Sequence, residues 1–227
     1  MFKFKGTKTT AKMKKSILFL SIILTTSICS FGQTEPQVIV PNFNDKFCDY
    51  IKKLESGQTD IDYQDFRFNF IESEQFKIAT KKSSTFDSLK KEMYVQMSKE
   101  NFQELIKITK RMLSIDYTSM IAHKILRQTY KIIGDTINAV KYKTIQFGLL
   151  YSIVKKGDGK TCETAWPVIQ ISEEYFILDV VLDAELLKQS IDNDGGLCDR
   201  MEVKADGKKK TYYFETTKVF QGYKKFK

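Results

Sequence analysis

The sequence contains a single histidine, His123, in 227 residues. Most zinc enzymes need several imidazole ligands, and histidine-based nucleophile systems need an imidazole base beside a serine or cysteine. One histidine therefore argues against both classes. No other complete set of catalytic or metal-ligating residues is present, so the sequence predicts no cofactor, no metal and no catalytic residue, and it leans against an enzyme without excluding one.

Proline and glycine are also scarce, with three and eleven residues. This scarcity excludes collagen-like and low-complexity chains. Hydrophobic residues make up 42% of the chain and aromatic residues 13%, which is enough to bury a core. The length suits one core or two small ones, and we expect a folded protein rather than a disordered one.

The first 32 residues have the composition of a secretory signal peptide. They carry six lysines and no acidic residue, and an apolar stretch over residues 17–28 follows the lysines. This stretch is shorter than the roughly 20 residues that a helix needs to span a bilayer. We expect cleavage between Gly32 and Gln33, export to the periplasm or the exterior, and no transmembrane anchor in residues 33–227.

The net charge of +9 comes largely from this leader. Without its six lysines, 31 basic residues face 28 acidic ones. The remaining lysine clusters lie at 208–210 and 224–227, where solvated turn and tail residues explain them better than a basic stripe for nucleic acid does. The sequence therefore predicts no nucleic-acid partner, and it leaves open whether Met1 or Met13 is the start.

Three cysteines lie beyond the leader: Cys48, Cys162 and Cys198. Export permits a disulfide bond, and the odd count leaves at least one thiol over or paired between chains. Cys162 and Cys198 flank the region of predicted strands and are the favoured pair. The absence of any disulfide stays an equal alternative, because connectivity cannot be derived from sequence.

Residues 33–156 are predicted to form a helical region. After a proline-containing lead-in, Asn44 or Asp45 is expected to cap a helix that runs to Leu54. The aromatic stretch Tyr63–Phe70 also has helical spacing. A stripe of this kind is typical of a core face.

The stretch over residues 84–154 is helical almost throughout, and polar residues interrupt it near Glu100, Asp116 and Asp135. Three or four antiparallel helices are implied. This stretch also contains a repeat, since Asn101 stands 34 residues before Asp135 in a similar context. Such a period is typical of helix-turn-helix units that stack on one another.

The segment over residues 101–150 resembles a tetratricopeptide array. The residues in family-like places are Leu126, Tyr130, Gly134, Asp135 and Ala139. The match departs from the family where Arg127 replaces a small residue and Tyr117 replaces a proline. We expect tetratricopeptide-like hairpins over about residues 85–150, with flanking structure to cap both ends.

Residues 157–227 are predicted to form a small antiparallel sheet of about four strands. The predicted strands are Trp166–Ile171, Tyr175–Leu182, Met201–Lys204 and Lys210–Phe220, and a short helix is predicted over Asp183–Ser190. Asp206 and Gly207 favour a type I′ hairpin turn between the last two strands. The predicted fold class is α+β, with the N-terminal helical hairpins packed on this C-terminal sheet in one compact unit.

The glycine-rich segment Gly157–Glu163 has part of the pattern of a phosphate-binding loop. Val154 stands where that pattern needs its first glycine, and a helix rather than a strand precedes the segment. The simpler interpretation is a helix C-cap followed by a turn. The acidic stretch Asp192–Asp199 suggests calcium in a similar way, but its residue order does not fit an EF-hand, and no metal site is predicted.

Two other polar features receive structural interpretations. Glu173 and Glu174 are adjacent carboxylates in a predicted tight turn, where we expect them to be solvated. His123 lies among apolar residues of a predicted helix. A packing or surface histidine is favoured there over a catalytic one.

Four segments of the sequence carry a wider resemblance: DYQDFRFNF, GDGKTCETAWPVI, EEYFIL and CDRMEV. With them the chain resembles an uncharacterised family of exported Bacteroidota proteins that is classed as a domain of unknown function. The resemblance implies export and a shared fold, and it assigns no activity, substrate or cofactor. Its candidate functional loop consists of Gly157, Asp158, Gly159, Lys160, Thr161 and Glu163, near Cys198 and Asp199. A structural role for the same residues stays open.

We therefore expect an exported, non-enzymatic module whose helical hairpins bind an unidentified protein or peptide partner. The alternative is a small-ligand-binding or enzymatic module centred on the loop at 157–163. An apolar or aromatic patch on the hairpins favours the first function. Convergent polar groups in a pocket at the loop favour the second.

Overall fold

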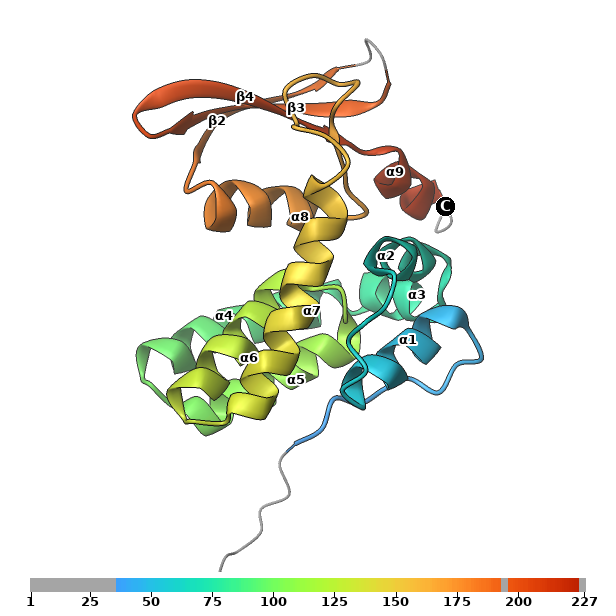
Figure 1. The fold of residues 1–227 in the computed structure, drawn as a ribbon, viewed down its shortest axis with the longest axis vertical. Coiled ribbons are helices and arrows are strands. Elements are labelled where there is room, and N and C mark those ends of the chain that lie inside the picture. The colour runs from blue at the N-terminus through green and yellow to red at the C-terminus, as the bar shows by residue number, and fades with distance from the viewer. Residues whose placement is uncertain (1–35, 193–195, 225–227) are drawn as a thin grey trace, which may run out of the picture. The chain divides into compact units, whose positions relative to one another are not determined.

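The computed structural model describes residues 36–192 and 196–224. The predicted signal peptide, residues 1–32, lies outside the described residues. The first part of the described chain is helical, and its last part holds a sheet with short helices (Figure 1). The helices of the first part are α1 (Lys46–Glu55), α2 (Tyr63–Glu72), α3 (Glu74–Lys81), α4 (Ser83–Ser98), α5 (Phe102–Ile115), α6 (Met120–Ile132) and α7 (Thr136–Val154). Within the described ranges, every helix is too short or too polar to cross a membrane.

Polar side chains fix the starts of six of these helices. The residues that accept a hydrogen bond from a backbone N–H of the first turn are Asp45, Asp62, Ser73, Asn101, Ser119 and Asp135. Such caps satisfy donors that lack a partner inside the helix. The predicted helix that begins after Asp45 and the breaks expected near residues 100, 116 and 135 are confirmed.

Helices α4 to α7 pack on one another in sequence order. Leu105, Ile108 and Met112 of α5 lie three or four residues apart and are buried, as a helix face in a core requires. Four helices between residues 83 and 154 confirm the predicted helical stretch. Their likeness to tetratricopeptide repeats stays a prediction.

The sheet has four strands in the order β1-β4-β3-β2. They are β1 (Trp166–Pro167), β2 (Glu185–Asp192), β3 (Cys198–Ala205) and β4 (Lys208–Glu215). β2, β3 and β4 pair antiparallel, whereas β1 pairs parallel to β4. The expectation of a wholly antiparallel sheet is therefore wrong for β1, because the chain enters this strand beside β4 rather than through a hairpin. Asp206 and Gly207 have φ angles of 52° and 72°, as the predicted type I′ turn requires.

Two predicted elements of the C-terminal part are wrong. The stretch Tyr175–Leu182, predicted as a strand, contains the end of α8 (Ile171–Tyr175) and a π-helix, η1 (Phe176–Val181). A short apolar run fits a buried helix as well as a buried strand, and here Phe176, Ile177 and Leu178 pack into the core from a helix. The stretch Asp183–Ser190, predicted as a helix, belongs mainly to β2, which pairs along its length with β3.

Two predicted strands are shorter than expected. Only Trp166 and Pro167 of the stretch Trp166–Ile171 are in a strand. The stretch Lys210–Phe220 leaves the sheet after Glu215, and α9 (Thr217–Lys224) follows. Tertiary packing decides these ends, which local composition does not encode.

One hydrophobic cluster runs through the helices and the sheet, from Phe47 on α1 to Val219 on α9. α2 contacts both α7 and α9, and α7 contacts β1. In Figure 1, α7 extends from beside α6 toward the sheet. The helices and the sheet thus share one core, in an α+β arrangement.

Candidate functional site

The candidate loop that follows α7 folds back onto Trp166. The Trp166 indole Nε1 donates to the Gly157 carbonyl at 3.0 Å. The Gly159 N–H donates to the Thr164 carbonyl, and the Gly159 carbonyl accepts from the Tyr213 N–H. Gly159 has a φ of 67°, and a Cβ at this position would lie within 2.9 Å of the indole ring. Gly159 therefore allows the backbone to lie against the tryptophan.

The polar groups of this loop bind one another. Asp158 accepts hydrogen bonds from the Lys160 backbone N–H at 3.1 Å and from the Thr164 hydroxyl at 2.7 Å, and it pairs with the Lys160 ammonium at 3.1 Å. These donors, with Thr164 first, lower the pKa of Asp158 to about 2. The hydroxyls of Thr161 and Thr164 also bond each other, at 3.1 Å. The side chain of Glu163 is exposed. The loop is therefore a turn whose polar side chains bond mainly to one another.

A disulfide bond ties the loop to β3. Cys162 and Cys198, the pair favoured from the sequence, are joined with their Cα atoms 5.8 Å apart. Asp199 follows Cys198 on the strand, and neighbouring side chains of a strand point to opposite faces of its sheet. Asp199 is nearly buried and accepts a hydrogen bond from Gln189 on β2 at 2.7 Å. The loop therefore lies near Cys198, as expected, but the Asp199 carboxylate belongs to a different set of contacts.

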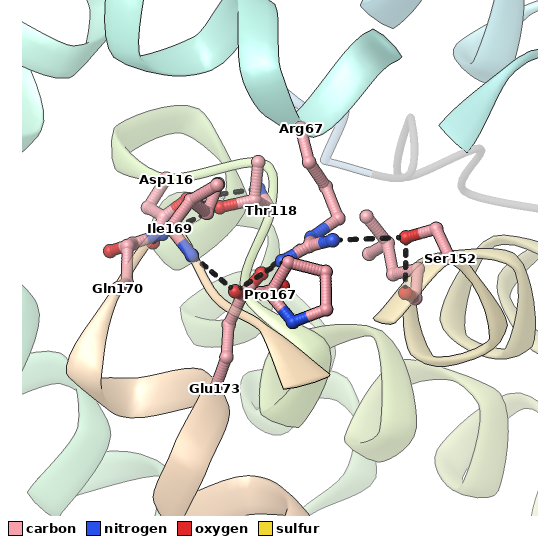
Figure 2. A network of polar contacts seen from close by, with 9 residues as sticks. Arg67, Asp116, Thr118, Ser152, Pro167, Ile169, Gln170 and Glu173 are labelled. Atoms are coloured by element: carbon pink, nitrogen blue, oxygen red, sulfur yellow. Dashed lines mark hydrogen bonds and ion pairs between the residues drawn. The ribbon is translucent and has the colours of Figure 1, made fainter. Parts of the chain in front are cut away.

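A buried ion pair connects α2 with α8. Arg67 and Glu173 are almost fully inaccessible, and the guanidinium donates from Nε and Nη2 to the two carboxylate oxygens at 2.8 Å and 2.6 Å (Figure 2). Arg67 also donates to the Pro167 carbonyl and to the Ser152 hydroxyl, at 2.9 Å and 3.3 Å. Glu173 accepts in addition from the Ile169 backbone N–H at 2.8 Å. The pair thus holds α2, α7, β1 and α8 together.

This network continues to the loop between α5 and α6. Asp116 accepts from the backbone N–H and the hydroxyl of Thr118, at 2.9 Å and 2.6 Å. Gln170 donates to both residues, at 3.2 Å to Asp116 and 2.7 Å to Thr118 (Figure 2). Burial raises the pKa of Asp116 despite these bonds.

The expectation that Glu173 and Glu174 are solvated is wrong for both residues. α8 replaces the predicted turn and directs them into the core, where each is at most 3% exposed. Neither carboxyl oxygen of Glu174 has a hydrogen-bond partner within the described part of the chain. Burial, followed by the charges of Asp199 and Glu173, raises the pKa of Glu174 to about 9. Glu174 therefore keeps its proton at neutral pH.

His123 is a packing residue in this structure. It is fully buried, its Nε2 lies 2.8 Å from the Tyr117 carbonyl oxygen, and its ring is flanked by Tyr117 and Tyr142. Burial lowers the pKa of His123 to about 4. A neutral imidazole inside the core has no access to a substrate.

A groove of about 930 Å³ is formed by α4, α5, α6 and α7, and we call it the hairpin groove. Its apolar lining consists of Met97, Phe102, Leu105, Ile125, Ile132, Ala139 and Val140. Ile132 and Val140 are 63% and 61% exposed, and the adjacent Ile137 is 82% exposed. A group of neighbouring apolar side chains with this exposure is typical of a surface that binds a partner.

A second groove of about 580 Å³ runs along α3, α4, α8 and α9. Asp116 and Gln170 line it, and both are already bonded inside the protein. Neither groove is lined by the loop at 157–163. The polar groups that the sequence singles out therefore do not converge on these hollows.

The sequence of this chain matches a known protein family. The family model described as domain of unknown function (DUF4919) matches residues 39–225. The chain belongs to the DUF4919 family. The matched range contains every helix and strand described above, so the DUF4919 domain includes the buried ion pair, the disulfide and the hairpin groove. Searches of the curated proteins and of the solved structures found no match.

Sequence reasoning missed the Arg67–Glu173 pair and the lining of the hairpin groove. Arg67 is the one basic residue of α2, and it stands between aromatic residues on a face that the core requires. A lone cation at such a position indicates a buried acidic partner. The sequence does not identify that partner, because Glu173 lies 106 residues further along the chain.

Proposed function

We propose that this DUF4919 domain is a non-enzymatic interaction module that binds a segment of another polypeptide in the hairpin groove. The observation that carries the proposal is the apolar lining, with Ile132 and Val140 more than 60% exposed. Burial of such side chains by a partner removes apolar surface from water and so stabilises the complex. The volume of about 930 Å³ accommodates several side chains of a docked segment.

The alternative function, centred on the loop at 157–163, receives less support. A ligand site needs polar groups that are free to turn toward a ligand. Asp158, Lys160 and Thr164 are engaged with each other, and Gly157 and Gly159 are engaged with the backbone or with Trp166. These contacts explain the loop as a structural element that anchors the edge of the sheet.

We also propose that the protein is exported and that residues 1–32 are removed. The six lysines followed by a short apolar stretch support this proposal. The Cys162–Cys198 disulfide supports it independently, because such bonds persist in oxidising compartments. The intact mass of protein recovered from the envelope or the medium tests it. A chain that begins at Gln33 is expected, and a chain that retains residues 1–32 would contradict export with cleavage.

Selection of displayed random peptides on the purified protein tests the interaction proposal. Ile132→Glu and Val140→Glu place a charge in the groove at exposed positions, where the fold should tolerate it. Ile191→Glu is the matched control, since Ile191 is 59% exposed and lies on β2. Selected peptides are expected to bind the wild type and the control and to lose most of their affinity for the two groove variants. Equal binding to all four proteins would overturn the proposal.

A further inference from the structure

The charged residues around the hairpin groove are mostly of one sign. Arg127, Lys131 and Lys143 line it together with a single acid, Glu100. Arg127 and Lys131 are four residues apart on α6, so they lie on one face of that helix. Lys143 stands on α7, three residues after the exposed Val140. Two adjacent helices therefore carry positive charge beside an apolar lining.

These cations have no acidic partner within the described ranges. Arg127 lies over the Phe147 ring with its Cζ 5.4 Å from the ring centroid and pairs with no carboxylate there. Lys131 and Lys143 are exposed and make no ion pair there. The chain beyond its first 32 residues is nearly balanced, with 31 basic and 28 acidic residues. The excess of positive charge at the groove is therefore a local property of this surface.

We infer that the occupant of the hairpin groove is an acidic segment of a partner polypeptide, in which apolar side chains alternate with carboxylates. This inference rests on the proposed function and adds the chemistry of the partner. Apolar side chains of the segment contact Ile132 and Val140, and its carboxylates pair with Lys131 and Lys143. Complementary charge of this kind steers association and selects the partner.

The composition of the groove decides against other occupants. A nucleic-acid backbone would place solvated phosphates against Ile132 and Val140. The apolar side chains would then add nothing to the affinity. The first 32 residues of this chain carry six lysines and no acid, so their charge has the wrong sign. An acidic and apolar polypeptide satisfies both features of the surface.

Fluorescence anisotropy with three synthetic peptides tests the inference. The first peptide alternates leucine and glutamate, the second alternates leucine and lysine, and the third alternates serine and glutamate. We expect the first to bind at least tenfold more tightly than the other two, and its affinity to fall as salt is raised. Equal binding of the leucine–lysine peptide, or preferential binding of a single-stranded oligonucleotide, would overturn the inference.

A charge reversal provides the matched control. Lys131→Glu with Lys143→Glu is expected to weaken the leucine–glutamate peptide by at least tenfold and to strengthen the leucine–lysine peptide. Lys204→Glu with Lys208→Glu changes the net charge equally on exposed residues of the sheet and should leave both affinities unchanged. An equal loss in the two double variants would also overturn the inference. The proposed function would survive alone if selected peptides bind the groove without acidic residues, and both would fail if Ile132→Glu leaves all binding intact.

Discussion

Arg67 on α2 and Glu173 on α8 form a two-point ion pair in the core of this protein, with nitrogen–oxygen distances of 2.8 Å and 2.6 Å. The two residues are 106 positions apart in the sequence. Because Arg67 also binds Ser152 and the Pro167 carbonyl, a single side chain joins the helical hairpins to the first strand of the sheet. This contact links the two parts of the fold in addition to the apolar core that they share.

Removal of either partner of this pair should destabilise the protein strongly. Arg67→Met leaves the Glu173 charge buried and unpaired, and such a change costs about 3–5 kcal/mol of unfolding free energy. Urea unfolding followed by circular dichroism measures the loss. The double variant Arg67→Met with Glu173→Leu removes both charges and should recover a large part of it. Additive losses from the two single changes would contradict the coupling.

Glu174 should make the stability of the protein depend on pH. The pKa of Glu174 is raised from 4.5 to about 9 in the folded chain, so folding retains a proton that the unfolded chain releases above pH 4.5. The stabilising contribution of this proton is complete below about pH 4.5 and is lost progressively as pH rises to about 9. Glu174→Gln binds no proton, so we expect it to be more stable than the wild type at pH 8 by about 2–4 kcal/mol.

Urea unfolding of both proteins at pH 5 and pH 8 measures this difference. The gap between Glu174→Gln and the wild type is expected to be small at pH 5 and large at pH 8. Glu202→Gln, at a half-exposed acid that pairs with Arg200, is the control, and its gap should not widen in this manner. A constant gap for Glu174→Gln would contradict the raised pKa.

The Cys162–Cys198 disulfide should contribute to stability through the chain that it closes. The two residues are separated by 36 positions, and closing a loop of this size is worth about 3–4 kcal/mol in the chain-entropy model. Cys162→Ser with Cys198→Ser should lower the unfolding free energy by this amount. Reduction of the wild type should produce a similar loss, while the double variant should not respond to the reductant. A wild type indifferent to the reductant would contradict the bond.

The contact between Gly159 and Trp166 gives a test of the structural role of the loop. Gly159→Ala adds a methyl group against the indole at a φ of 67°, and we expect a loss of about 1–3 kcal/mol. Gly134→Ala is the matched control, because Gly134 has a similar φ of 82° but no atom within 4 Å of the added Cβ. Thermal unfolding of both variants should show the larger loss for Gly159→Ala. Equal losses would mean that the loop does not pack on Trp166.

The helical part of the fold was predictable because its signals are local. Caps such as Asp45 and Asp135 lie next to the helices that they begin, and apolar spacing marks the buried faces. The type I′ turn at Asp206 and Gly207 is encoded in the same way. These features need only a few neighbouring residues to be recognised.

The stretch over residues 175–190 was not predictable because its signals conflict. Phe176 to Val181 is rich in residues that favour strands, but it forms η1, whose first three residues are buried. The charged stretch after it is held in β2 by pairing with β3. The interpretation of Glu173 as a solvated residue is wrong for a different reason. Its burial depends on Arg67, whose distance along the chain leaves no local trace in the sequence.

The most direct test of the hairpin groove is a methyl NMR titration of the protein with the leucine–glutamate peptide. The methyl groups of Ile132 and Val140 should shift in a saturable manner, and those of Ile191 on β2 should stay in place. This result would establish the groove as the binding surface. Saturable shifts at Ile191 or around Trp166, with Ile132 and Val140 unmoved, would contradict the account.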